Sequence, residues 1–338
     1  MCVLPLRFVP YDDLGDTPNV VVDGAATAST RLTLSHWPGS PTPPEVRDDL
    51  SAQIVFHALE RPDWFDGIDV VSNNHFDQDG LASAYTLIDP ASAQVRKDLV
   101  IDVARAGDFG TFTNRDAARI AIALAEYEDP DRSPLGAAGL TGSYTETTAF
   151  LYRELLPRFT EMLDHPDRHR ALWEREDAHL GESADAIARG TVQIAENEAV
   201  DLAVVTVPDD WPARATHRFT QEWTEAVHPM AVNNATERLR ILLVHGHRYR
   251  LELRYESWVM FVSHPVLRRP DLGPLAEQLS ALERSGARWE ADPPGALTPQ
   301  LRIADGAESA LPPEQVRSRI VAFLAIAPAE WDPFAPRT

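Results

Sequence analysis

In the N-terminal part of the chain, the pattern of hydrophobic and polar positions alternates between short extended stretches and helices. Residues 19–23 are a β-rich run and residues 30–36 alternate polar and apolar side chains, so both predict strands. After a proline-rich loop at 38–44, apolar residues recur at helical spacing to about residue 60. A buried strand at 68–72 and a helix at 80–88 follow. This alternation predicts an α/β domain with a parallel sheet.

The predicted secondary structure of the rest of the chain changes twice, first to helices and then to a mixture of strands and helices. From about residue 91 to 198 the apolar spacing is helical nearly throughout, except for a glycine-flanked break at 106–110. Residues 201–208, 239–245 and 249–261 then predict strands, and helices are expected at about 271–285 and 313–326. We therefore predict two domains: a parallel-sheet α/β domain with a helical extension at 1–198, and a smaller mixed α+β domain at 199–338.

Composition narrows the classes of function. The net charge of −21 argues against bulk binding of nucleic acid, but it leaves room for a small anionic substrate at a locally positive site. No apolar run is long enough to cross a membrane and the N-terminus does not resemble a signal peptide, so a cytoplasmic protein is expected. The only cysteine, Cys2, excludes a disulfide framework and an all-cysteine metal site.

The segment His75-Phe-Asp77-Gln-Asp79-Gly80 carries the strongest chemical signal. Imidazole and carboxylates together suit Mn²⁺, Zn²⁺ or Fe²⁺, whereas Mg²⁺ prefers oxygen ligands alone. The simpler alternative is a polar turn with Asp79 as the helix N-cap, which explains one aspartate but not three converging side chains.

His36 follows the strand at 30–36, as the His75–Asp79 loop follows the strand at 68–72. The carboxyl ends of parallel strands meet at one edge of a sheet, where ligands bind. We therefore expect the His36 ring within about 10 Å of the Asp79 carboxylate, as a metal ligand or a general acid. The alternative is a structural histidine. Asp49 is a weaker candidate, since it could simply be a solvated residue near a helix.

Residues 70–83, with the His-x-Asp-x-Asp-Gly core, resemble the first motif of the DHH phosphoesterase superfamily. That superfamily includes single-strand exonucleases, family II pyrophosphatases and phosphodiesterases of oligonucleotides or cyclic dinucleotides. The resemblance implies that His75 and Asp77 bind one Mn²⁺ and that Asp79 binds another. The chain has no Asp-His-His triplet and no glycine-rich signature of the associated substrate domain. Asp108, in the glycine-flanked break, is the first candidate for a further metal aspartate, and Asp102 is the second.

The second predicted domain offers candidates for binding substrate. His228 and Asn233 lie in a loop-like stretch at 226–236, where turn formation is the alternative explanation. Arg254 lies in a predicted hairpin, and the DHH-associated domain similarly uses basic residues to hold phosphate. A solvated strand arginine is the alternative there.

The sequence thus predicts a metal-dependent hydrolase of a phosphoester or phosphoanhydride, with Mn²⁺ as the expected cofactor and Mg²⁺, Zn²⁺ or Fe²⁺ as alternatives. A small anionic substrate is the expected partner, no membrane is expected to take part, and a homodimer is compatible with the sequence. Two other functions stay open. One is a metalloenzyme acting on a non-phosphate bond in a biosynthetic pathway, and the other is a non-catalytic ligand-binding relative.

Overall fold

The computed structural model describes residues 5–218, 221–284 and 286–335, so Cys2 lies outside the described residues. The described chain divides into two compact units. The first unit holds the chain up to Ala178, together with 215–223 and 261–263, and the second unit holds the remainder. The division falls within a long helix, whereas the boundary predicted from the sequence lies later, at 198/199.

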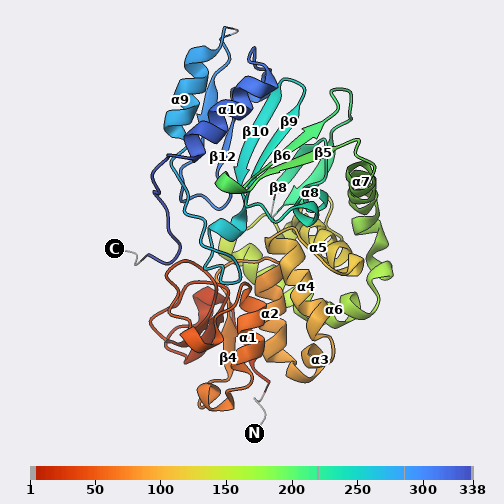
Figure 1. The fold of residues 1–338 in the computed structure, drawn as a ribbon. Helices are drawn as coiled ribbons and strands as arrows, with labels where there is room; N and C mark the ends of the chain where they lie inside the picture. The colour runs from red at the N-terminus through yellow and green to blue at the C-terminus, as the bar shows by residue number, and fades with distance from the viewer. Residues whose placement is uncertain (1–4, 219–220, 285, 336–338) are drawn as a thin grey trace. The chain divides into compact units, whose positions relative to one another are not determined.

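The first unit consists of a small sheet and a group of helices (Figure 1). Its main elements are β1 (Arg7–Phe8), β2 (Asn19–Val22), β3 (Thr30–Leu34), α1 (Ser51–Ala58), β4 (Val70–Ser72), α2 (Gln78–Ile88), α3 (Pro90–Val95), α4 (Lys97–Asp108), α5 (Arg115–Glu128), α6 (Tyr144–Asp164) and the start of α7 (Arg170–Ala188). Strands β7 (Arg214–Arg218) and β8 (Gln221–Glu225) form a separate two-stranded sheet.

The four-stranded sheet has the order β1-β4-β2-β3, and every pair in it is parallel. The central strand β2 is Asn-Val-Val-Val and is buried along its whole length, as expected for a parallel strand covered on both faces. Helix α1 packs against β3, and α2 packs against β4, β2 and β1. The carboxyl ends of β2, β3 and β4 therefore lie at one edge, and the residues that follow them are brought together there.

Two local features of this unit differ from what the sequence suggested: the alternative that made Asp79 an N-cap and the helix break expected at 106–110. Helix α2 begins at Gln78, and its N-cap is Asp77, which accepts the backbone N–H of Gly80. Asp79, the residue that the simpler interpretation made the N-cap, lies inside the first turn. The glycine-flanked break does not interrupt α4, which continues to Asp108. Gly107 is needed there because a Cβ would lie 2.5 Å from the Gln78 side chain, and the chain turns only at Gly110, where φ is +61°.

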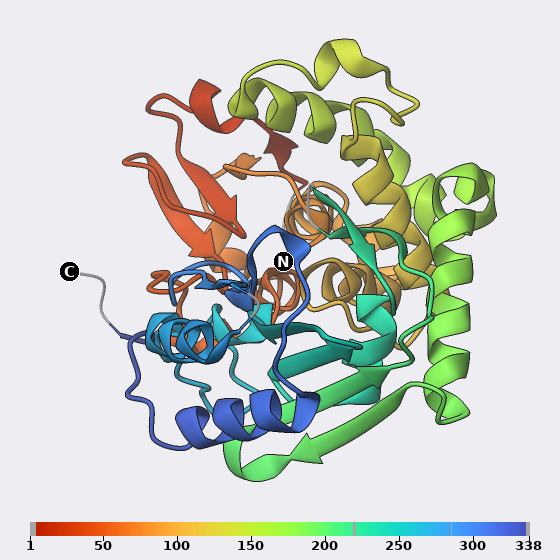
Figure 2. The ribbon, with the colours of Figure 1, turned by 90° about the horizontal axis from the view of Figure 1, so that it is seen from above.

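The second unit is built on a mixed six-stranded sheet with the order β11-β12-β10-β9-β6-β5 (Figures 1 and 2). Its strands are β5 (Gln193–Asn197), β6 (Leu202–Val207), β9 (Arg240–His245), β10 (Arg248–Leu253), β11 (Trp289–Ala291) and β12 (Gln300–Ile303), and its helices are α8 (Pro229–Ala235), α9 (Gly273–Leu282) and α10 (Pro313–Leu324), with the end of α7. Strands β6 and β9 are parallel, and the other pairs are antiparallel.

Alternation along β6 explains why both faces of this sheet are covered. Leu202 and Val204 belong to the core under α9 and α10, whereas Ala203, Val205 and Val207 belong to a second core on the other face. Residues on one strand alternate between the two faces of a sheet, so an apolar strand can contribute to both cores. The predicted fold class, a parallel-sheet α/β region followed by a mixed α+β region, is confirmed.

Two predicted elements of the second unit differ from the structure. The stretch at 226–236, expected to be a loop, contains helix α8. The strand expected at 249–261 ends at Leu253, after which residues 255–257 form a short 3₁₀ helix.

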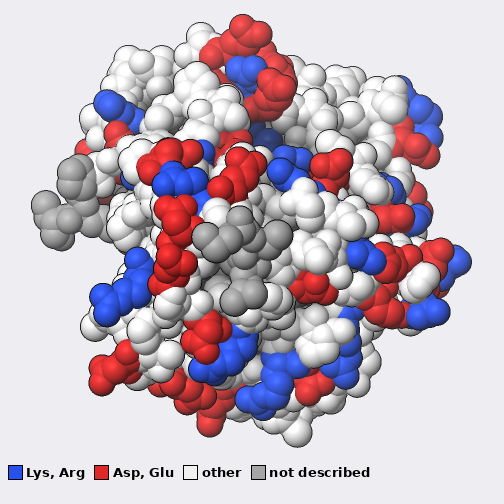
Figure 3. Space-filling model, turned by 90° about the horizontal axis from the view of Figure 1, so that it is seen from below, with Lys and Arg blue, Asp and Glu red and all other residues white. Residues whose placement is uncertain are grey.

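Across residues 5–218, 221–284 and 286–335, no helix combines the length and apolarity that crossing a bilayer requires. Acidic and basic side chains are interleaved over the face drawn in Figure 3.

Candidate metal centre

Six ionisable side chains of the first unit converge at the carboxyl edge of its sheet. Asp23 follows β2, His36 follows β3, the loop from β4 to α2 contributes His75 and Asp77, and the first turn of α2 contributes Asp79. Asp108, the last residue of α4, completes the group. The six residues, here called the ligand cluster, are Asp23, His36, His75, Asp77, Asp79 and Asp108.

One half of the ligand cluster surrounds His36. The Nε2 atom of His36 lies 3.4 Å from a carboxylate oxygen of Asp23, 3.4 Å from one of Asp108 and 3.9 Å from one of Asp79. Ligand atoms of Asp23, His36 and Asp79 lie within 4.8 Å of one another, a spacing that could hold a metal ion.

The other half surrounds His75. Its Nε2 atom lies 2.8 Å from Asp77 Oδ2 and 3.3 Å from Asp23 Oδ2. Asp23, His75 and Asp77 form a second group with ligand spacing. Asp23 therefore belongs to both groups, with Oδ1 directed toward one histidine and Oδ2 toward the other.

Burial distinguishes the closed side of the cluster from its open side. The side chains of Asp23, His36, Asp79 and Asp108 are at most 1% exposed, whereas those of His75 and Asp77 are each 12% exposed. Within the described residues, the cluster is therefore most exposed to solvent at His75 and Asp77. The Trp37 ring borders that side, with its centroid 4.9 Å from that of His75.

Neighbouring backbone groups fix the orientation of these side chains. His36 Nδ1 lies 2.6 Å from the carbonyl oxygen of Asp49. A carbonyl can only accept, so Nδ1 carries a proton, and Nε2 presents its lone pair to the carboxylates whenever the ring is neutral. Asp79 accepts the N–H groups of Ser51 and Ala52, each at 2.7 Å, at the start of α1. Such outer contacts are typical of metal-binding side chains.

The backbone at Asp23 is strained in a way that serves the site. Asp23 has φ +44°, in the left-handed region that few residues other than glycine adopt, although aspartate tolerates it better than most. A Cβ on the next residue, Gly24, would lie 2.1 Å from the Asn74 side chain. The close approach of the β2 and β4 loops thus requires this Asp-Gly pair and places the Asp23 carboxylate between the two histidines.

Charge interactions within the cluster shift its protonation equilibria. Burial acts to raise the pKa of Asp23, but hydrogen bonds and charge interactions with His36 and His75 outweigh it and hold that pKa below its ordinary value. Burial acts to lower the pKa of His75, but Asp77 and Asp23 raise it well above its ordinary value. Burial and the Asp23 carboxylate raise the pKa of Asp79 to about 7. Such interdependent groups are typical of functional sites.

The structure brings together His36, His75, Asp77, Asp79 and Asp108, the leading first-domain candidates from the sequence. His36 and Asp79 lie at 3.9 Å, within the expected distance. Asp108 joins the cluster, although it lies on a helix rather than in a loop. Asp102 does not, because its carboxylate accepts the N–H groups of Thr113 and Asn114 at the entry to α5.

Sequence reasoning missed Asp23, and the interpretation of Asp49 was wrong. Asp23 directly follows a predicted strand, so the edge argument used for His36 would have found it as well. Asp49 is not simply a solvated residue, because it has hydrogen-bond partners within the protein. Its carboxylate accepts the N–H groups of Val262 and Ser263, while its carbonyl holds His36.

The second-unit candidates are engaged within their own unit. His228 is buried and is the N-cap of α8, where Nδ1 accepts the N–H of Met230. Asn233 lies inside the same helix, largely buried. Arg254 is 2% exposed, donates to the Thr236 carbonyl at 3.1 Å and pairs with Glu256, so it is not a solvated strand residue. Substrate binding by these three residues stays a prediction, which their internal contacts do not favour.

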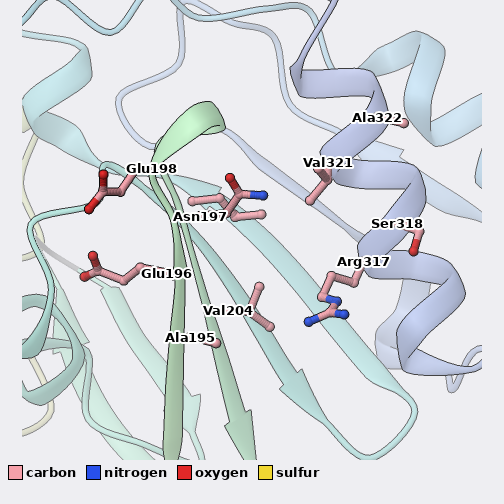
Figure 4. Close-up of a pocket in the computed structure, with 10 residues that line it drawn as sticks. Ala195, Glu196, Asn197, Glu198, Val204, Arg317, Ser318, Val321 and Ala322 are labelled. Carbon is pink, nitrogen blue, oxygen red and sulfur yellow. The ribbon is translucent and has the colours of Figure 1, made fainter.

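A groove of about 600 Å³ also lies in the second unit, between the β5–β6 strands and α10. Figure 4 shows Arg317 of α10 pointing toward the strands and Glu196 of β5 pointing away from the helix. Glu196 lies 3.3 Å from Arg238 Nε, and Arg317 lies 2.7 Å from Glu314. The residues that line this groove include no counterpart of the ligand cluster.

Comparison with known proteins gives a family but no activity. No curated protein matches the chain. A family of unknown function, DUF6687, matches residues 4–335. Since this match covers nearly the entire sequence, the protein belongs to the DUF6687 family.

Proposed function

We propose that this protein is a cytoplasmic hydrolase that uses two divalent metal ions, with Mn²⁺ as the expected ion, to cleave a phosphoester or phosphoanhydride bond in a small substrate. The observation that carries the proposal is the overlap of two ligand groups on the shared carboxylate of Asp23. Residues from four separate elements meet there with ligand spacing. Capping, ion pairing or solvation explains individual members of the cluster, but not this convergence.

The residues present fit two divalent cations. Four carboxylates supply four negative charges, which two divalent ions balance. When the His36 ring is neutral, its Nε2 lone pair is directed at carboxylate oxygens, an arrangement that is repulsive unless a cation or proton lies between them. Asp23 Oδ2 is buried and lies 3.3 Å from His75 Nε2, so one ion between them could contact both atoms. The mixture of imidazole and carboxylate ligands favours Mn²⁺, Zn²⁺ or Fe²⁺ over Mg²⁺.

Each residue of the cluster has a distinct task under this proposal. His36, Asp79 and Asp108 would hold one ion on the closed side, His75 and Asp77 would hold the other on the open side, and Asp23 would bridge them. Bound ions of this kind activate water and neutralise charge on phosphoryl oxygens. His36 is fully buried and its Nδ1 proton is held by Asp49, so it serves as a ligand rather than as the general acid.

The phosphate preference draws on the sequence resemblance of residues 70–83 to the first DHH motif. The observed position of that motif, between a parallel strand and a helix at the sheet edge, is consistent with it. With a net charge of −21, the chain can hold an anionic substrate only where local positive charge offsets the overall field. Metal ions at the open side would supply that charge.

The first prediction is Mn²⁺-dependent phosphoester hydrolysis. The purified protein should be assayed against bis(p-nitrophenyl) phosphate, pyrophosphate and short dinucleotides, before and after chelation. We expect turnover of at least one compound, loss of at least about 90% of it after chelation, and recovery with Mn²⁺, because metal supplies most of the charge stabilisation. Asp77→Asn retains an acceptor for the α2 cap and should abolish turnover. Turnover that survives complete metal removal would contradict the proposal. A metal-loaded protein that cleaves none of these compounds would favour a non-phosphate bond.

A further inference from the structure

We propose that a second groove, in the first unit, binds a small amphipathic anion: a ligand with an apolar body and one acidic group. The groove has a volume of about 560 Å³ and lies between β1, the end of α2 and the outer face of α6. That volume falls in the range of small-molecule sites. None of the ligand cluster lines it, so this proposal does not depend on the proposed hydrolase activity.

The walls of the groove are apolar and rigid. Leu6, Phe8, Ile88 and Leu156 line it. The Phe8 ring stacks on Tyr152 with a centroid distance of 4.4 Å, and the Tyr152 ring is completely buried. A wall of packed aromatic and aliphatic side chains offers a preformed surface for a planar or aliphatic group, because little ordering is needed on binding.

Most polar groups around the groove are already satisfied. The Tyr85 hydroxyl lies 2.9 Å from that of Thr160, and the Asp89 side chain accepts the N–H of Ser92 at the start of α3. These groups therefore define the rim without offering strong new partners.

Two arginines at the groove are available to a ligand. Arg153, on α6, forms no ion pair within the described part of the chain. Arg7 pairs with Asp69 at 3.5 Å, but both side chains are more than half exposed, and such surface pairs contribute little and exchange readily. With two arginines against the one carboxylate of Asp89, the groove has a net positive charge beside its apolar wall, which matches an apolar molecule with one carboxylate, sulfonate or phosphate group. That complementarity sets the class of ligand.

The experiment uses anilinonaphthalene sulfonate, a fluorescent aromatic anion, with the full-length protein. We expect saturable binding of one dye per chain and, in Arg153→Glu, an affinity at least about fivefold lower, because a favourable charge is replaced by a repulsive one. Arg158→Glu is the matched control: Arg158 lies on the same helix but pairs with Glu154 and does not line the groove. It should leave the affinity unchanged.

A competition assay tests whether the groove recognises the negative charge of the ligand as well as its apolar chain. Decanoate should displace the dye at a concentration at least about fivefold lower than decanol, which has the same chain but no charge. Three results would overturn the proposal: no saturable dye binding, equal affinity in the wild type and Arg153→Glu, or equal competition by decanoate and decanol.

Discussion

We expect Asp23→Asn to prevent metal binding in both halves of the cluster and to lower metal-dependent hydrolysis by roughly 10³-fold, which corresponds to about 4 kcal/mol of transition-state stabilisation. Asp23 directs one carboxylate oxygen toward His36 and the other toward His75. An amide keeps an oxygen that can accept the hydrogen bond from Ser51 and tolerates the left-handed backbone. The fold should therefore survive while the bridging charge is lost. Metal content after dialysis, measured by mass spectrometry, and kcat/KM test the prediction.

Asp102→Asn is the matched control for this variant. Asp102 is also a buried aspartate of the first unit and lies on α4, as Asp108 does, but it accepts backbone N–H groups and does not face the ligand cluster. Its replacement should lower stability by about 1–3 kcal/mol, as for weakened buried hydrogen bonds, and leave metal content unchanged. If Asp23→Asn retains the metal content of the wild type, Asp23 is not a bridging ligand.

Metal should also stabilise the fold, and more strongly at pH 8 than at pH 6. A ligand at 100 times its Kd contributes about 2.7 kcal/mol, which for a protein of this size raises Tm by roughly 4 °C. Thermal unfolding of metal-free and Mn²⁺-loaded protein measures this shift.

The sign of the pH effect follows from Asp79. Without metal, its pKa is raised to about 7 in the folded state, above about 3.9 in the unfolded chain. The stability associated with this raised pKa is fully present below about pH 4 and is lost as the pH rises to about 7. His75, whose pKa is also raised, acts in the same direction. The metal-free protein therefore loses stability as pH rises through this range, while metal binding becomes easier because the ligands are deprotonated.

Either of two observations would count against this account of the metal-free cluster. One is a Tm shift with Mn²⁺ that is larger at pH 6 than at pH 8. The other is an equal shift in Asp23→Asn, which would place the stabilising ion elsewhere on this acidic protein.

The sequence predicted the parts of the site that follow from residue chemistry and from the rule that parallel strands place their carboxyl ends at one edge of the sheet. The strands before His36 and His75 were evident from their patterns, and parallel strands require their carboxyl ends to meet. His36 accordingly lies beside Asp79. The same rule applied to β2 predicts Asp23, but a single aspartate before glycine also has the appearance of an ordinary turn.

Other features depended on long-range packing that local pattern does not encode. Gly107 looked like a helix breaker, yet its missing side chain allows α4 to approach Gln78 and places Asp108 at the cluster. A local N-cap was the alternative explanation of Asp79, yet its carboxylate accepts backbone N–H groups at the start of α1, a helix distant in sequence. Arg254 looked like an exposed strand residue, but the chain turns before it and buries it against Glu256. In each case a tertiary contact outweighed a local tendency.

The central claim, a two-metal centre built on Asp23, is tested most directly by titrating metal-free protein with Mn²⁺ and recording electron paramagnetic resonance spectra. We predict two ions per chain and a spin-coupled spectrum, because the two ligand groups share a carboxylate and ions in such sites lie about 3.5–4 Å apart. A spectrum of isolated Mn²⁺ at full loading, or no binding above that of Asp23→Asn, would contradict the claim.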